Sequence, residues 1–181
     1  MPKVRLAVAC LGFAMMLPTT VAVLAQRAAM APAAPLPSQI LTAKKVFISN
    51  AGSGVDEKLW SGGPAQPYNE LYASIKSWEQ YEIVATPENA DIILQISYAN
   101  PITEVIDHSL CVGNCAKYSP QFRLALLDPK TSIDLWTITE KLQAVDRNHR
   151  SADTNLVAAI GNLVADLKAL TAQSASANVA K

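Results

Sequence analysis

A pair of alternating apolar runs joined by a short turn constrains the fold of this chain most. Every second residue from Phe122 to Leu126 is large and apolar, and a second run over 133–144 follows Asp-Pro-Lys-Thr at 128–131. Alternation with a period of two is typical of a strand that buries one face. Proline at the second position of a tight turn fits its fixed φ angle. The pattern therefore predicts a β-hairpin over 121–144.

The rest of the chain supplies further strands and two helices. Short β-type runs predict strands over 44–49, 81–85 and 91–99. Apolar residues spaced three and four positions apart predict a helix over 68–78 and a longer one over 156–170. Pro67 suits the first turn of the first helix, and Ser151 or Asp153 is the expected N-cap of the second.

These elements define an α+β fold class with the order β-α-β-β-β-β-α. Two helices that each carry one apolar stripe are expected to cover one face of a sheet. The prediction is a two-layer α/β sandwich, with a mostly antiparallel five-stranded sheet and two helices on one face. Residues 102–119 are expected to form a loop or a frayed extension.

The N-terminal segment 1–25 has the layout of a cleavable secretory signal peptide. Lys3 and Arg5 precede an apolar run, and Ala25 ends it at the expected cleavage site before Gln26. The alternative is a transmembrane anchor, but Pro18 breaks the run. We therefore expect a periplasmic or secreted protein with no stable membrane span after signal cleavage.

The exported chain is expected to contain one domain. Residues 26–39 are rich in proline and alanine and predict a disordered leader. A single α/β domain is expected over 40–172, followed by a flexible tail over 173–181.

Cys111 and Cys115 are the only cysteines that remain after removal of the signal peptide. An even count in an oxidising compartment favours a disulfide between them. The alternative is that His108 joins these two cysteines as a ligand of zinc or copper, although no fourth ligand is evident nearby.

The sequence shows no recognisable set of catalytic residues. It lacks a nucleophile elbow, and the glycines at 52 and 54 are not followed by the lysine of a phosphate loop. The formal net charge is zero, so no basic field attracts nucleic acid. Trp60 lies in a glycine-containing loop without a periodic partner. It is a candidate partner contact, and the alternative is that it folds back onto the domain.

The segment ADIILQISYA, followed by PQFRLALLDPKTSIDLWTITEKL, resembles a known group of periplasmic domains. The group includes the outer-membrane activators of penicillin-binding proteins, the curli-export lipoproteins and the N-terminal domain of TolB. The resemblance covers about 81–142. It implies an α/β sandwich used for protein contacts in the cell envelope, with Trp136 as a packing residue and no catalytic residue. The chain departs from the lipoproteins of this group because it lacks their lipidation motif, and its Cys111/Cys115 loop is not part of the pattern.

The sequence therefore predicts a non-enzymatic secreted or periplasmic envelope protein with a protein-interaction domain and no cofactor. Its expected partner is another protein of the cell envelope. The alternative function is a small-molecule or metal carrier that uses the Cys/His loop at 102–119.

Overall fold

A computed structural model describes residues 35–53, 59–105, 116–142 and 149–179. The predicted signal peptide and most of the predicted leader lie outside the described residues. The helices and strands occur in the order α1 (Ser38–Thr42), β1 (Lys45–Ser53), η1 (Gly63–Ala65), α2 (Gln66–Trp78), β2 (Glu82–Ile83), η2 (Pro87–Asn89), β3 (Ile92–Ala99), β4 (Ile102–Val105), β5 (Ala116–Tyr118), β6 (Gln121–Leu127), β7 (Asp134–Lys141) and α3 (His149–Val179).

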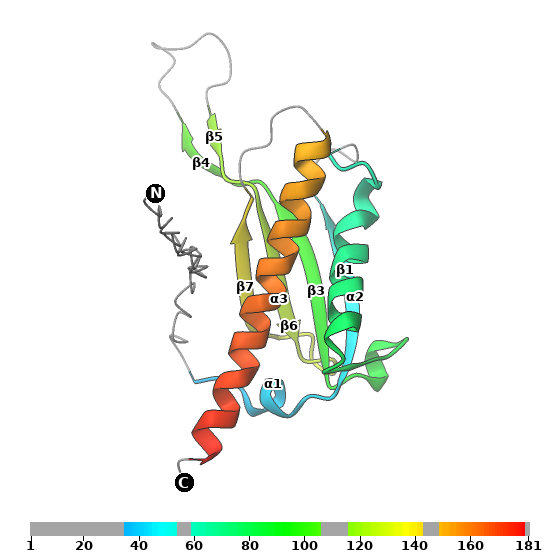
Figure 1. The fold of residues 1–181 in the computed structure, drawn as a ribbon. Helices are drawn as coiled ribbons and strands as arrows, with labels where there is room; N and C mark the ends of the chain where they lie inside the picture. Colours follow the sequence, from blue (N-terminus) through cyan, green and yellow to red (C-terminus); the bar gives the residue numbers. More distant parts are fainter. Residues whose placement is uncertain (1–34, 54–58, 106–115, 143–148, 180–181) are drawn as a thin grey trace, which may run out of the picture.

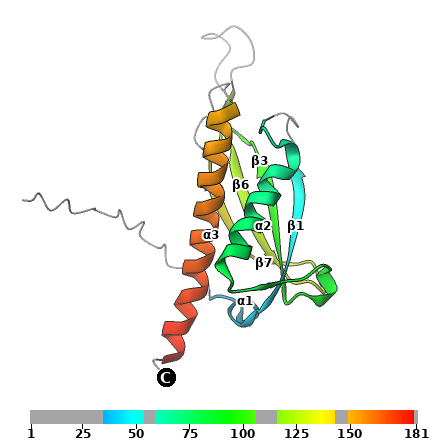
Figure 2. The same ribbon diagram turned by 45° about the vertical axis from the view of Figure 1, so that its right-hand side comes forward.

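The main sheet contains five strands in the order β2-β1-β3-β6-β7. β1 is parallel to β2 and β3, whereas the long β3–β6 and β6–β7 ladders are antiparallel. Helices α2 and α3 lie side by side across one face of this sheet (Figure 1 and Figure 2). The predicted two-layer sandwich of five strands and two helices is therefore confirmed.

The core lies between the two layers. Alternate residues of the central strands point toward the helices, and the apolar stripes of α2 and α3 meet them. At the end of α2, the Lys168 Nζ atom of α3 lies 5.3 Å from the ring centroid of Trp78. The fully or almost fully buried members of this core include Leu71, Ile75, Leu94, Ile96, Phe122, Leu124, Leu156, Ile160, Leu163 and Leu167.

Helix α3 between Ser151 and Ala172 is long and apolar enough to cross a membrane by length and composition alone. In this structure Leu163 and Leu167 are fully buried against the sheet. A core helix passes the same test of length and composition, and the packing of α3 is that of a core helix.

Residues 128–133 connect β6 to β7, as the sequence predicted. The Asp128 side chain organises this turn, because its Oδ2 atom accepts a hydrogen bond of 2.6 Å from Thr131 Oγ1. The backbone N–H of Ser132 donates to the Asp128 carbonyl at 2.8 Å, and Ser132 has a φ of 58°. The strand itself spans only Asp134–Lys141, which is shorter than the predicted run to residue 144.

The fold extends beyond the predicted domain limits of 40 and 172. Leu36 and Ile40 pack into the core, so the chain is already part of the domain before residue 40. Helix α3 continues to Val179 rather than ending near 172. It also begins at His149, which places Asp153 inside the helix, where its Oδ1 atom accepts a hydrogen bond from the Ser61 N–H at 3.0 Å. Ser151 also lies inside α3, so the prediction that Ser151 or Asp153 is the N-cap is wrong.

Candidate protein-contact site

Strands β4 and β5 form a two-stranded antiparallel ribbon that projects from one end of the main sheet (Figure 1). We call residues 102–105 and 116–118 the arm. The sequence prediction treated 102–119 as a loop or frayed extension and missed these two strands.

Two prolines separate the arm from the main sheet. The β3–β6 ladder ends at the pair Ala99 and Gln121. Between this pair and the arm lie Pro101, which comes after β3, and Pro120, which comes directly before β6. Proline has no N–H to donate to a ladder. Ser119 N–H donates to the Pro101 carbonyl at 3.0 Å, and this bond closes the base of the arm. The arm is therefore a separate sheet.

The arm has an apolar face and a charged face. Ile102 pairs with Tyr118 and Glu104 pairs with Lys117, because an irregularity between Ile102 and Glu104 shifts the register. Adjacent residues of a strand point to opposite faces, so Tyr118 and Lys117 lie on different faces. Val105 pairs with Ala116, which lies on the same face of β5 as Tyr118. The register shift therefore places Val105 on the apolar face with Ile102 and Tyr118.

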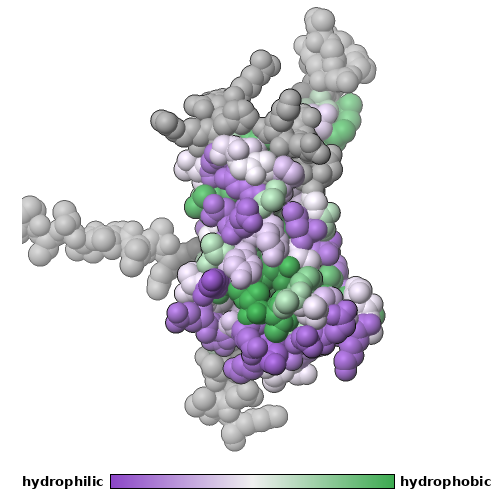
Figure 3. Space-filling model, turned by 90° about the vertical axis from the view of Figure 1, so that its right-hand side faces the viewer, coloured by the Kyte–Doolittle hydropathy of each residue, from purple (hydrophilic) through white to green (hydrophobic). Residues whose placement is uncertain are grey.

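The apolar face of the arm is open to solvent. The exposed fractions are 56% for Ile102, 75% for Val105 and 54% for Tyr118. Figure 3 shows strongly hydrophobic residues on the arm at the top of the molecule. Among the described residues, the other exposed large hydrophobic side chains are Ile133 in the β6–β7 turn and Val157 on α3. An isolated two-stranded ribbon is at best marginally stable in water, and a gathered apolar surface is typical of an interaction site.

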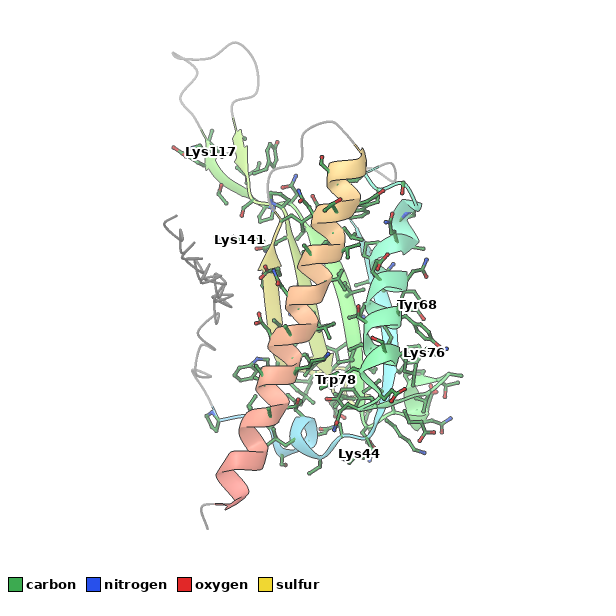
Figure 4. All side chains as sticks on the ribbon, in the orientation of Figure 1. Lys44, Tyr68, Lys76, Trp78, Lys117 and Lys141 are labelled. Atoms are coloured by element: carbon green, nitrogen blue, oxygen red, sulfur yellow. The ribbon has the colours of Figure 1, made fainter. Side chains whose placement is uncertain are left out.

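The opposite face of the arm carries an exposed ion pair. Lys117 Nζ lies 2.7 Å from Glu104 Oε2, and the hydrogen bond to Glu104 raises the pKa of Lys117. Lys117 projects from the arm in Figure 4. A solvent-exposed pair of this kind adds little net stability. The ion pair makes this face of the arm hydrophilic. The apolar face is therefore the candidate contact surface of the arm.

Trp60 is buried in the core, near the end of the main sheet where the arm begins, and not on the surface. Only 3% of the residue is exposed. Its ring centroid lies 5.2 Å from that of Tyr98 and 5.6 Å from that of Phe122, which pair across β3 and β6 one position before the last pair of that ladder, Ala99 and Gln121. The predicted partner contact at Trp60 is therefore wrong. The alternative is correct, because Trp60 folds back onto the domain and completes an aromatic cluster there.

The predicted disulfide between Cys111 and Cys115, and the alternative metal site of His108, Cys111 and Cys115, lie outside the described residues. Both stay predictions. Within the described ranges, no group of three or more histidine, cysteine, aspartate or glutamate side chains is placed to hold a metal ion. Trp136, predicted to be a packing residue, is partly buried against the core.

A polar recess of about 460 Å³ lies at the other end of the sheet from the arm, between α1, the start of β3 and the β6–β7 turn. Its polar groups bind one another. Gln39 Nε2 donates to the Asp91 carbonyl at 2.8 Å and to Asp128 Oδ1 at 3.2 Å. Asp91 Oδ2 accepts the backbone N–H groups of Lys44 at 2.8 Å and Lys45 at 2.9 Å. We assign these contacts a structural role, because they join α1, β1, β3 and the turn.

Asp91 gives this end of the domain a pH-dependent stability. The hydrogen bonds from the N–H groups of Lys44 and Lys45 lower the pKa of Asp91 in the folded protein. The stabilisation is therefore present above the unfolded pKa of about 3.9, and it is lost as the pH falls through the lower folded pKa. We expect Asp91→Asn to lower the urea midpoint at pH 7, with a difference from wild type that shrinks below pH about 4.

The matched control for Asp91→Asn is Glu88→Gln, which removes a nearby carboxylate in η2 without removing the bonds to Lys44 and Lys45. Urea titrations of the three proteins from neutral to acidic pH give the comparison. A difference between wild type and Asp91→Asn that stays constant over this range would contradict the assignment.

One signal in the sequence could have located the arm. Ile102, Val105 and Tyr118 are residue types that favour strands, and they are interleaved with Thr103 and Lys117. The short length of both runs hid the pairing, because neither run by itself shows a clear period. Their cross-strand register is visible only in the folded chain.

Neither a protein-family profile nor a curated protein sequence matches the chain. The PelC dodecamer from Paraburkholderia phytofirmans is similar in fold, with 11% identity, a TM-score of 0.46, and coverage of 74% of this chain and 91% of that chain. A neuraminyllactose-binding hemagglutinin homolog from Helicobacter pylori has 12% identity and a TM-score of 0.44, with coverage of 70% and 85%.

A third similar structure, lipoprotein B from Nitrosomonas europaea, has 17% identity and a TM-score of 0.35, with coverage of 78% of this chain and 92% of that chain. Bacterial lipoproteins are thus among the similar structures. TM-scores this low carry no information about the activity or assembly of this chain. The specific resemblance to penicillin-binding-protein activators, curli-export lipoproteins and TolB is not confirmed by these comparisons.

Proposed function

We propose that this chain is a non-enzymatic protein of the cell envelope that binds another envelope protein through the apolar face of the arm. The observation that carries the proposal is the gathering of Ile102, Val105 and Tyr118 on one face of an exposed ribbon. Export rests on the signal-peptide pattern of residues 1–25. Burial of large apolar side chains, including a tyrosine, supplies most of the binding energy at typical protein interfaces.

The shape of the arm favours a protein partner over a small molecule. A small-molecule site is concave and buries most of its ligand, whereas the arm is a projecting ribbon with two broad faces. The arm alone offers less area than the roughly 800 Å² per partner that a standard interface buries. The partner is therefore expected to contact the adjacent end of the main sheet as well.

The double variant Ile102→Ser/Tyr118→Ser tests the proposal. We expect it to reduce capture of a specific envelope protein by about tenfold or more, because each lost anchor typically costs more than 1 kcal/mol of binding. The free energy of unfolding should change by less than about 0.5 kcal/mol per site, since both side chains are exposed. The measurement is quantitative cross-linking in an envelope fraction, followed by mass spectrometry.

Ile133→Ser is the matched control, because Ile133 is 61% exposed and lies in the β6–β7 turn, away from the arm. The same partner should be captured by wild type and by this control. Equal capture by wild type, the arm variant and the control would show that the arm is not the contact surface.

A further inference from the structure

Among the described residues, the outer edge of β7 is open along its full length. β7 spans eight residues, Asp134–Lys141, and pairs with β6 on one side only. In the part of the chain that the structure describes, no strand pairs with its other side. The other edge of the sheet differs, since β2 pairs with the start of β1 and Asn50 Nδ2 donates to the Pro64 carbonyl of η1 at 3.4 Å. A long free edge is a template for pairing with another chain.

The hydrogen bonds to β6 determine which backbone groups of β7 point outward. Leu142 N–H donates to the Pro120 carbonyl at 2.8 Å, toward β6. The register is unbroken from Lys141 to Trp136. Because the backbone N–H and C=O of successive residues alternate in direction along a strand, those of Thr139 and Thr137 point away from β6. These groups are the donors and acceptors that the free edge offers.

We propose that β7 pairs antiparallel with β7 of a second copy of this chain, which joins the two main sheets into one. Antiparallel pairing of a strand with itself satisfies a two-fold axis, so both copies use the same surface. The strand begins with Asp134 and ends with Glu140 and Lys141. Glu140 Oε1 accepts a hydrogen bond of 2.7 Å from Asn162 of α3, so this carboxylate is engaged on the helix side of the sheet. Antiparallel pairing brings Lys141 of one copy toward Asp134 of the other, twice, whereas parallel pairing would place Lys141 beside Lys141 and Asp134 beside Asp134.

Side chains beside this edge add apolar area to the contact. Leu135 and Trp136 are only partly buried against the core, and a second copy on the edge would cover them further. Arg123 Nη2 donates to Asp134 Oδ2 and to Thr137 Oγ1, which holds the acidic end of β7 in place. Lys141 lies at the opposite end of the strand, near the base of the arm (Figure 4).

Sedimentation of the chain without residues 1–25, over a wide range of concentrations, tests the dimer. Wild type is expected to form a dimer. Thr139→Pro should raise the dimer Kd by at least about tenfold, because proline removes only an outward N–H and is tolerated on a strand edge that faces solvent. Thr139→Ala keeps the N–H and should remain as dimeric as wild type. Far-UV circular dichroism checks that each variant is folded.

A wild type that stays monomeric at all concentrations, or a folded Thr139→Pro variant that dimerises as tightly as wild type, overturns the proposal. If Thr139→Pro does not fold, the double variant Thr137→Lys/Thr139→Lys replaces it, because charge on an edge strand opposes pairing without removing an N–H. The arm variant Ile102→Ser/Tyr118→Ser should remain dimeric. If the arm variant is monomeric, the copies associate through the arm, and the β7 proposal fails independently of the proposed function.

Discussion

Replacement of Trp60 by alanine is expected to lower the free energy of unfolding by about 3–5 kcal/mol, the range for removal of a large buried aromatic side chain. Trp60 is 3% exposed, and its ring packs edge-on against Tyr98 and nearly parallel to Phe122. The ring centroids of Tyr98 and Phe122 lie 5.4 Å apart. Loss of the indole would leave a cavity next to both rings, at the base of the arm.

Urea titration of wild type, Trp60→Ala and Trp60→Phe measures this effect. Trp60→Phe should cost less than Trp60→Ala, because it keeps a ring against Phe122. It also loses no hydrogen bond, since the Trp60 Nε1 atom has no partner among the described residues. A cost below about 1 kcal/mol for Trp60→Ala would show that the site does not depend on the ring for its packing.

Leu163→Ala is expected to lower the free energy of unfolding by about 2–5 kcal/mol. Leu163 is fully buried near the middle of the apolar stripe of α3, in the same core cluster as Leu94 and Leu124. The side chain faces the sheet, and the surrounding strands cannot close a cavity without losing their register. The loss of stability should therefore be that of a core site at which the cavity does not collapse.

Val157→Ala is the control on the same helix. Val157 is 50% exposed, so its truncation should change stability by less than about 0.5 kcal/mol. If Leu163→Ala lowers the free energy of unfolding no more than Val157→Ala does in the same urea titration, the docking of α3 onto the sheet is contradicted.

Local patterns in the sequence predicted most of the framework of this domain. The alternation from Ile92 to Tyr98 and from Phe122 to Leu126 predicted the two central strands, and both are confirmed. The three- and four-residue spacing of the last helix predicted its buried face, from Leu156 to Leu167. Such patterns are sufficient because a regular strand or helix that packs on one side repeats its burial with its own backbone period.

The proposed contact site on the arm was not predicted from the sequence, which placed the partner contact at Trp60. Residues 102–119 had a predicted role only in the alternative function, as the Cys/His loop of a small-molecule or metal carrier, whereas the described part of the segment forms two strands with an apolar face. Ile102 and Tyr118 acquire a common face only when their strands pair with a shifted register. No local period encodes that shift, so the face could not be derived from either run.

The amino-acid sequence by itself determined the strands of the main sheet, the two long helices, their two-layer arrangement and the residues of the central core, because each depends on the periodicity of neighbouring residues. Helix α1 and the two strands of the arm were not predicted. The tertiary structure alone decided the burial of Trp60, the bonds of Asp91 to Lys44 and Lys45, and the position of β7 at the edge of the described sheet. These features join segments that are distant in the chain. The stability of each of these contacts depends on which strands become neighbours in the sheet. The strand order is established only when the whole core packs.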